Sequence, residues 1–234
     1  MRAIIFDVDR TLLDGMSGYL FAAYLWRTGA MPWAGRLRSG WAMVRYRTGL
    51  SDEMAIVEAG VTCYAGLTVD RVRELAAQAV TATMIGRVYR EALETVKKHV
   101  DAGDRVLLAT GSSVFLAEAL ARHVGAHIGI GTDSERNGDK LLPVMSKPPC
   151  VREGKLELVQ RRLADEGLEL AEALVYTDNG IDIPLIEMVG DAVAVNPDVF
   201  LARYASERGL PVERWTTPCD GNHRHTGTSW PLKE

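Results

Sequence analysis

The chain has 234 residues, of which 47% are hydrophobic and 25% charged, and its formal net charge is −4. This composition predicts a globular protein with a sizeable core and excludes a largely disordered chain. The net charge gives no support to nucleic-acid binding. Three cysteines without a CxxC pair favour free thiols in a reducing, cytoplasmic compartment, and no apolar run is long enough to predict stable membrane insertion.

The first predicted element is an apolar run, residues 3–6, that ends in Asp7 and Asp9. A run without polar interruptions is typical of a buried strand in a parallel sheet. The two acids are two residues apart, so on an extended chain their carboxylates lie on the same face. Such carboxylates repel each other unless a cation or a shared proton relieves them, and Mg²⁺ prefers oxygen ligands. A solvated strand end is the alternative interpretation.

Residues 16–84 are predicted to form a small helical unit inserted after this strand. Its first part, residues 16–50, has no acid, five arginines and three tryptophans. Three interpretations stay open: a bundle whose aromatic side chains form its own core, a positive lid over an anionic substrate, and an interfacial helix on anionic lipid. One helical face would carry Trp33, Leu37, Trp41 and Val44. Further helices are expected to begin near residue 51 and to span 68–84.

Helices and strands alternate along the rest of the chain. Strands are predicted at 105–109, 126–131, 173–177 and 192–195, and helices at 87–102, 114–123, 153–166, 184–188 and 198–208. Asn137-Gly138 indicates a β-hairpin turn. The alternation predicts an α/β fold, with a Rossmann-like parallel sheet core and helices on both faces. Residues 211–234 lack periodicity and are expected to form a loosely ordered or draped tail. In that tail, the spacing of Cys219, His223 and His225 matches no common metal site.

Polar side chains follow three of the predicted strands. The first strand is followed by Asp7 and Asp9, the second by a turn of small residues that precedes a helix, and the fourth by two more acids. The later groups are Thr110, Gly111 and Ser112, and Asp178 and Asp182. The carboxyl ends of parallel strands share one edge of the sheet, where Lys155, at a helix start, can join them. The set predicts a Mg²⁺-dependent phosphoryl-transfer centre.

The order of these motifs resembles the haloacid dehalogenase superfamily, in its phosphoserine-phosphatase-like subgroup with a helical cap after the first strand. The matching motifs are DVDRTL at 7–12, TGS at 110–112, Lys155 and DNGID at 178–182. The resemblance covers roughly residues 1–205. It implies a core made of 1–15 and 85–210, a helical cap over 16–84 and a C-terminal tail over 211–234.

The resemblance also implies roles for these residues. Asp7 would be the nucleophile that forms an aspartyl-phosphate, and Asp9 would protonate the leaving alcohol and then activate water. Mg²⁺ would be bound by the Asp7 and Asp178 carboxylates and the Asp9 backbone carbonyl, with Asp182 as a further ligand or directly behind them. The phosphoryl oxygens would be held by Thr110, Gly111, Ser112 and the catalytic Lys155.

Three positions depart from the family's pattern. Arg10 and Asn179 stand where many relatives have Gly and Ser. Met16 occupies the position at which phosphoserine phosphatases carry a substrate-reading Glu, so phosphoserine is not the expected substrate. The basic, aromatic cap favours another small phosphorylated metabolite, larger or more apolar and able to carry a second anionic group, with a lipid phosphate as the lesser alternative.

Three other functions stay open at this point. A phosphotransferase would use the same aspartyl-phosphate and pass the group to an alcohol. A receiver-type signalling or binding domain also pairs a phosphorylated Asp with Mg²⁺, Thr and Lys, but there the Asp follows a later strand. A non-catalytic protein of the same fold is the third alternative, although every expected catalytic position is occupied. The sequence predicts no oligomeric state.

Overall fold

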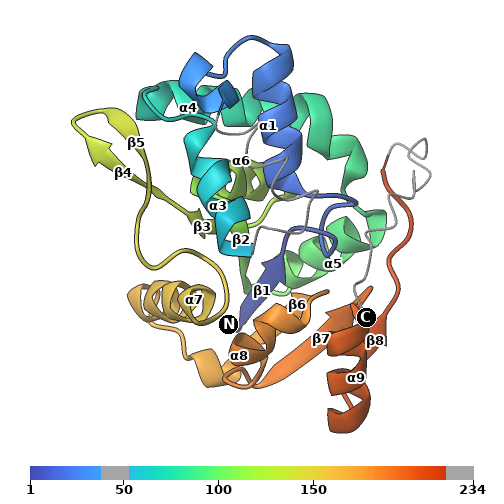
Figure 1. Cartoon of the computed structure of the whole chain (residues 1–234). Coiled ribbons are helices and arrows are strands. Elements are labelled where there is room, and N and C mark those ends of the chain that lie inside the picture. The colour runs from blue at the N-terminus through green and yellow to red at the C-terminus, as the bar shows by residue number, and fades with distance from the viewer. Residues whose placement is uncertain (38–52, 220–234) are drawn as a thin grey trace.

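The fold is built on a six-stranded sheet with the order β3-β2-β1-β6-β7-β8, in which every neighbouring pair is parallel. It is seen in a computed structural model that describes residues 1–37 and 53–219 (Figure 1). The strands are β1 (Ala3–Asp7), β2 (Arg105–Ser113), β3 (Ile128–Thr132), β6 (Leu174–Thr177), β7 (Asp191–Val195) and β8 (Val212–Glu213). The predicted α/β parallel sheet is confirmed.

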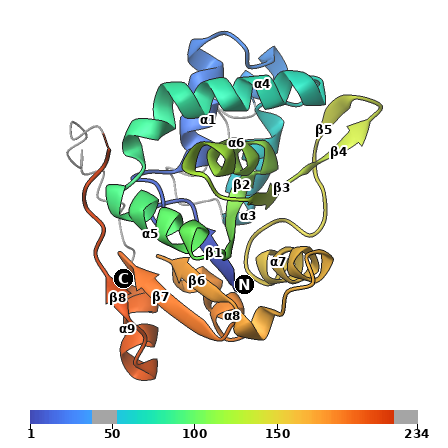
Figure 2. The same cartoon turned by 180° about the vertical axis from the view of Figure 1, so that it is seen from behind.

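Helices cover both faces of this sheet because the buried strands are apolar on both sides. Ile4 and Phe6 face one hydrophobic cluster with α5 (Arg90–Asp101) and α6 (Val114–Val124), whereas Ala3 and Ile5 face the other. The second cluster is completed by α7 (Glu153–Asp165), α8 (Ile183–Ile186) and α9 (Val199–Arg208). Figure 2 shows the face carrying α5 and α6.

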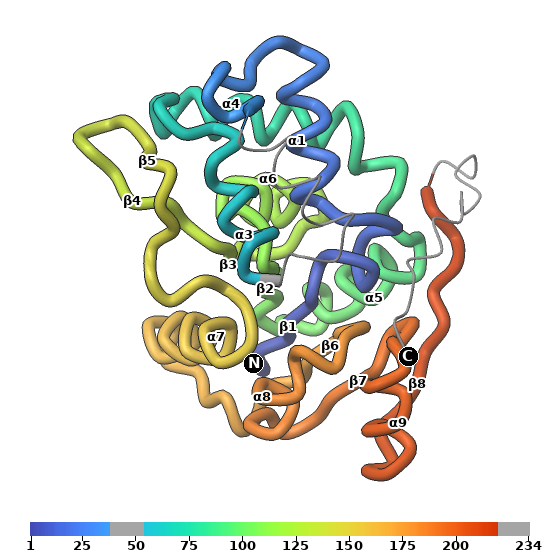
Figure 3. Tube along the Cα trace, viewed as in Figure 1, coloured from blue at the N-terminus to red at the C-terminus, as the bar shows by residue number. Residues whose placement is uncertain are grey.

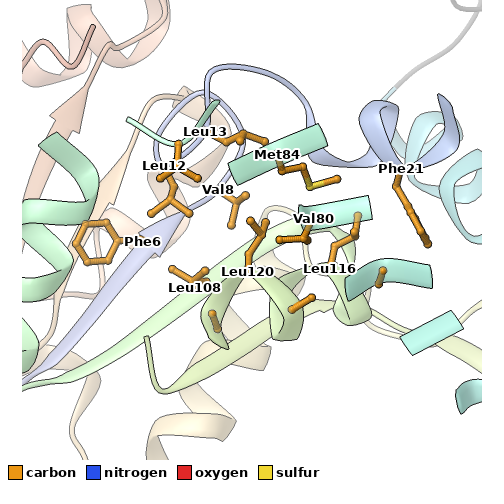
Figure 4. Close-up of a cluster of buried hydrophobic side chains, with 14 of the residues drawn as sticks. Phe6, Val8, Leu12, Leu13, Phe21, Val80, Met84, Leu108, Leu116 and Leu120 are labelled. Atoms are coloured by element: carbon orange, nitrogen blue, oxygen red, sulfur yellow. The ribbon is translucent and has the colours of Figure 1, made fainter. Parts of the chain in front are cut away.

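The described part of residues 16–84 is helical, as predicted. It contains α1 (Ser17–Arg27), α3 (Glu53–Thr62), α4 (Val69–Ala79) and the π-helical turn η1 (Val80–Met84), followed by the 3-10 turn η2 (Ile85–Arg87). Phe21 and Val80 from these helices belong to the same buried cluster as Val8 and Leu12 of the first motif (Figure 4). The helices therefore rest on the core through a continuous apolar contact, while the division into cap and core stays a prediction.

The aromatic side chains at the start of this unit are mostly exposed. Phe21 is buried, but Trp26 is 54% exposed, and Trp33 and Leu37 are 75% and 66% exposed. The interpretation of the aromatic residues as the unit's own core is therefore wrong for this tryptophan pair. Trp41 and Val44, which were expected to share a face with Trp33, lie outside the described residues.

The Asn137-Gly138 turn joins β4 (Ser134–Asn137) to β5 (Lys140–Met145) in an antiparallel hairpin, as predicted. This hairpin is bound to the connection between α3 and α4. The Gly66 N–H donates to the Leu141 carbonyl over 2.7 Å, and the Leu141 N–H donates to the Leu67 carbonyl over 3.0 Å. The inserted helices are thus held to the core at a point remote from their two chain connections.

Of the two expected forms of the tail, loosely ordered or draped, the draped one describes residues 211–219, which we call the C-terminal strap. β8 pairs with β7, and Trp215 is buried against Tyr176 with 5.8 Å between ring centroids. The Arg90 N–H then donates to the Thr217 carbonyl, and the Cys219 N–H to the Val88 carbonyl. The strap runs from the edge of the sheet past the start of α5 (Figure 3). The two-residue strand β8 is too short to show a hydrophobic periodicity in the sequence. His223 and His225 lie outside the described residues.

The two remaining short elements are the 3-10 turns η3 (Leu170–Glu172), before β6, and η4 (Gly180–Asp182), which carries the last acid of the fourth motif. None of the helices within 1–37 and 53–219 is both long and apolar enough to cross a bilayer.

Candidate active site

A buried lysine joins the first and fourth motifs. Asp7 is the last residue of β1, Lys155 lies in the first turn of α7, and Asp182 ends η4. The Lys155 ammonium donates to Asp7 Oδ1 over 2.7 Å and to Asp182 Oδ2 over 2.8 Å. None of the three residues is more than 8% exposed. Charge-assisted hydrogen bonds of this length fix both carboxylates on one cation.

Thr177 and Thr11 support the acids of this cluster. Thr177, at the end of β6, donates its hydroxyl to Asp182 Oδ2 over 2.7 Å. Thr11 donates to Asp178 Oδ1 over a longer 3.4 Å. Both threonines are fully buried. Each hydroxyl therefore takes the place of a water molecule that would hydrogen-bond to the carboxylate if it were exposed.

The cluster holds more negative than positive charge, and the pKa values reflect this. Burial, together with the charges of Asp182 and Asp9, raises the pKa of Asp7 to about 7, against the opposing effect of Lys155. Burial and Asp7 raise the pKa of Asp178 well above its usual range, against the opposing charge of Arg10. Although burial opposes its charge, Asp182 and Asp7 raise the pKa of Lys155 well above its usual range. A cation near Asp7 and Asp178 would therefore be stabilised.

Asp9 has a different set of partners from Asp7. Its Oδ2 accepts hydrogen bonds from the Thr110 and Ser112 hydroxyls, each over 3.2 Å, and its Oδ1 accepts one from the Ser17 N–H over 2.5 Å. The Ser17 hydroxyl donates to that of Ser112 over 2.8 Å. Asp9 thus links the second motif to the first residue of α1, whereas Asp7 binds the lysine.

The second motif differs from its predicted form. The strand does not end at Ala109 but continues through Ser113, with a shift in its pairing to β3 between these residues, and α6 begins directly afterwards. Gly111 lies within this stretch, and a Cβ there would be 2.9 Å from Val151 Cγ1. Any side chain at this place would therefore force Val151 to shift, because the segment before Lys155 packs against Gly111.

The acidic side chains fit Mg²⁺ in part. Within the part of the chain that the structure describes, no three His, Cys, Asp or Glu side chains are gathered as a preformed metal site. Mg²⁺, however, often takes one or two carboxylates and completes its shell with water and substrate phosphate. Burial and the charge of Asp7 raise the pKa of Asp178, and the buried Asp182 Oδ1 has no hydrogen-bond partner among the described residues. The Asp7 and Asp178 carboxylates and the Asp182 Oδ1 atom are therefore the kind of oxygen ligands that Mg²⁺ binds.

The structure brings together the residues proposed from sequence and adds others. Direct hydrogen bonds join Asp7, Lys155 and Asp182, and a second set joins Asp9, Thr110 and Ser112. Sequence reasoning missed Ser17 and Thr177 as members of these networks, and it missed Thr132, whose hydroxyl donates to the Gly111 carbonyl. Isolated Ser and Thr residues carry no recognisable pattern, although Thr177 stands directly before the DNGID motif.

Arg10, whose position could not be interpreted from sequence, has a left-handed backbone with φ of 66°. Such a conformation is uncommon for residues other than glycine, so the backbone at this position would accommodate glycine without strain. The positive charge of Arg10 lowers the pKa of Asp178 and so opposes the rise that burial causes.

Two curated relatives match most of the chain. The "Inhibition of morphological differentiation protein" of Streptomyces azureus is 27% identical over 232 residues, covering 98% of this chain and 84% of that protein. A histidinol-phosphatase of Neisseria meningitidis is 27% identical over 213 residues, covering 89% of this chain and 96% of that protein.

Two solved structures share the fold. A protein of unknown function from Bordetella pertussis has a TM-score of 0.80 and 30% identity, covering 91% of this chain and 98% of that one. A substrate-bound phosphoserine phosphatase has a TM-score of 0.62 at 16% identity, covering 91% and 92% of the two chains.

The family model of the haloacid dehalogenase-like hydrolases matches residues 4–187, which is more than half of the chain. This range contains all four motifs of the site, from Asp7 to Asp182. The chain therefore belongs to the haloacid dehalogenase-like hydrolases.

Proposed function

We propose that this protein is a Mg²⁺-dependent phosphatase that hydrolyses a small phosphomonoester through a phosphorylated Asp7. The observation that carries the proposal is the arrangement of two neighbouring acids with different partners. Asp7 is bound by the buried Lys155 ammonium, and Asp9 is bound by hydroxyl groups of the second motif. Membership of the family and a relative named histidinol-phosphatase support it.

In this proposal, Asp7 attacks the phosphorus atom and the ester oxygen leaves with a proton from Asp9. Water then attacks the aspartyl-phosphate, and Asp9 takes a proton from that water. Lys155 and the donors around Gly111 hold the phosphoryl oxygens as negative charge develops. A bound Mg²⁺, held by Asp7 and Asp178, would supply a positive charge that keeps Asp7 ionised beside an anionic substrate.

We infer that the substrate is a small phosphorylated metabolite other than phosphoserine. Met16, at the position of the substrate-reading acid of phosphoserine phosphatases, is 40% exposed and offers no negative charge to a substrate amino group. The exposed Trp26 and Trp33 of the inserted unit supply apolar surface on the part of the molecule expected to select the leaving group.

The experiment is a release assay for inorganic phosphate with a panel of sugar, nucleotide, aromatic, amino-alcohol and lipid phosphates that includes phosphoserine and histidinol phosphate. We expect hydrolysis by the wild type with Mg²⁺ and none by Asp7→Asn. Labelling with a phosphorus-32 substrate should mark Asp7 in the wild type. Equal behaviour of the wild type and Asp7→Asn would overturn the activity, and phosphoserine as the best substrate would overturn the specificity.

The role of Mg²⁺ is tested by the same assay after chelation and metal return, combined with Asp178→Asn. We expect this variant to need more Mg²⁺ for half-maximal rate, because it loses a carboxylate of the proposed site. The matched control is Asp165→Asn, since Asp165 is exposed at the end of α7 and should leave the metal dependence unchanged. An unaltered Mg²⁺ requirement in Asp178→Asn contradicts the assignment.

A further inference from the structure

Thr132, the last residue of β3, is a buried hydroxyl that lies outside the family's motifs. It is 1% exposed. Its Oγ1 donates to the Gly111 carbonyl over 2.9 Å and accepts a hydrogen bond from the Cys150 N–H over 3.0 Å. The hydroxyl thus uses its donor and one acceptor position on two backbone groups far apart in sequence.

The two backbone groups belong to the two halves of the proposed phosphate site. Gly111 stands between Thr110 and Ser112, whose hydroxyls donate to Asp9. Cys150 directly precedes Val151, whose carbonyl accepts hydrogen bonds from the N–H groups of Gly154 and Lys155. Thr132 therefore connects the segment beside Asp9 to the segment that begins the helix of Lys155.

The segment around Gly111 packs closely against the segment around Val151. A side chain at Gly111 would meet Val151 Cγ1 at 2.9 Å. Apolar packing alone has no directional preference and would let the segments slide, whereas two hydrogen bonds to one hydroxyl fix their relative position. Loss of the hydroxyl would also leave a buried N–H and a partly buried carbonyl without this partner.

We propose that Thr132 is a positioning residue that sets the spacing between the Thr110-Gly111 donors and the Lys155 ammonium on opposite sides of the transferred phosphoryl group. This inference rests on the proposed function. Displacements of about 1 Å in a catalytic site can reduce rates roughly 100-fold, so a residue that holds two phosphate-binding segments together affects catalysis without touching substrate.

The test compares Thr132→Val, which keeps the shape and removes the hydroxyl, with Thr132→Ser, which keeps the hydroxyl. We expect Thr132→Val to lower kcat/KM about 10- to 100-fold and to weaken inhibition by inorganic phosphate and orthovanadate. Thr132→Ser should restore both to within about threefold of the wild type, because the two hydrogen bonds remain. Thr132→Ala provides the same comparison if the valine variant does not fold.

All measurements are made with Mg²⁺, well below the melting temperature of the least stable variant, and are corrected for the folded fraction. A merely structural role would lower the melting temperature but leave kcat, KM and the phosphate inhibition constant of the folded enzyme unchanged, and that result would overturn the inference. Absence of Mg²⁺-dependent hydrolysis in the wild type itself would instead overturn the proposed function and the inference with it.

Discussion

At the scale of single residues, the buried acids of the site carry more negative charge than Lys155 can neutralise. Lys155 is shared between Asp7 and Asp182, and the favourable partners of Asp178 are the Thr11 hydroxyl and the charges of Arg10 and Lys155. The cost of burying these acids is visible in the raised pKa values of Asp7 and Asp178. The substrate site is therefore maintained at the expense of stability.

We predict that Asp7→Asn stabilises the metal-free protein above neutral pH. Asp7 has a pKa of about 7 when folded and an ordinary value of 3.8, so between these values the folded state binds the proton that the unfolded state has lost. Stability therefore falls as pH rises through this window, and the full penalty is present above about pH 7. Asparagine removes the titration.

Thermal melts in chelator from about pH 5 to pH 8 measure this effect. The difference in melting temperature between Asp7→Asn and the wild type should grow with pH. Asp165→Asn, on the surface of α7, should show no such trend. A constant or shrinking difference for Asp7→Asn would show that the Asp7 carboxylate is not destabilised by its surroundings.

The sequence predicted the charged residues of the site because strand ends and motif spacing place them at one edge of a parallel sheet. It could not predict which oxygen binds which donor. Thr110 and Ser112 were expected to face phosphate, and their hydroxyls are instead bonded to Asp9 in this structure. Ser17 bonds to Ser112, 95 positions later in the chain, and Thr132 bonds to Gly111, 21 positions earlier, so no local pattern contains either contact.

At the scale of elements, β3 and α6 approach each other unusually closely. A Cβ on Gly129 would lie 2.3 Å from the Ala117 carbonyl carbon, and one on Gly131 would lie 2.7 Å from Val114 Cα. Both contacts are with backbone, which cannot move aside as a flexible side chain can. The start of α6 is thereby placed against the end of β3, next to the second motif.

We predict opposite effects for two glycine-to-alanine changes. Gly129→Ala should lower the free energy of unfolding by about 1–3 kcal/mol or more, because the added methyl group overlaps α6. Gly60→Ala, within helix α3 and with no atom within 4 Å of the added Cβ, should raise it by up to about 1 kcal/mol. Urea denaturation measures both, and a Gly129→Ala variant that is as stable as the wild type would contradict the close approach of β3 and α6.

Hydrophobic periodicity predicted every strand of the sheet except β8, and its errors lie at element ends. The helix expected over 68–84 is α4 followed by the π-helical turn η1, and the helix expected from residue 87 begins at Arg90 after a 3-10 turn. The apolar pattern continues through such changes of helix type, because side chains are buried on the same side. Backbone hydrogen bonding, not apolar spacing, distinguishes these turns.

At the scale of the whole molecule, the C-terminal strap joins the sheet edge to the connection between the inserted helices and the core. The Glu91 carboxylate accepts hydrogen bonds from the Thr216 and Thr217 N–H groups. Although partial burial opposes ionisation, these hydrogen bonds and those of its own backbone lower the pKa of Glu91 below 4.5. This anchoring is complete above the ordinary pKa and is lost as pH falls through the lowered value.

We predict that Trp215→Ala lowers the free energy of unfolding by about 3–5 kcal/mol, because a buried aromatic ring is lost from the cluster that contains Phe6 and Tyr176. Trp33→Ala is the matched control. Its ring is 75% exposed, and the change should stay within about 0.5 kcal/mol. Guanidinium denaturation gives both values. Equal small effects would mean that the strap does not contribute to the folded core.

The attachment of the β4–β5 hairpin to the α3–α4 connection has a consequence for how such proteins can diverge. The Gly66 and Leu67 backbone groups pair with Leu141, more than seventy positions later in the chain. An exchange of the inserted helices alone would leave this backbone pairing without its other half. Descendants that acquire a new insert, and with it a new specificity, therefore have to reshape the hairpin as well, so the two segments should be inherited together and grafted together in chimeras.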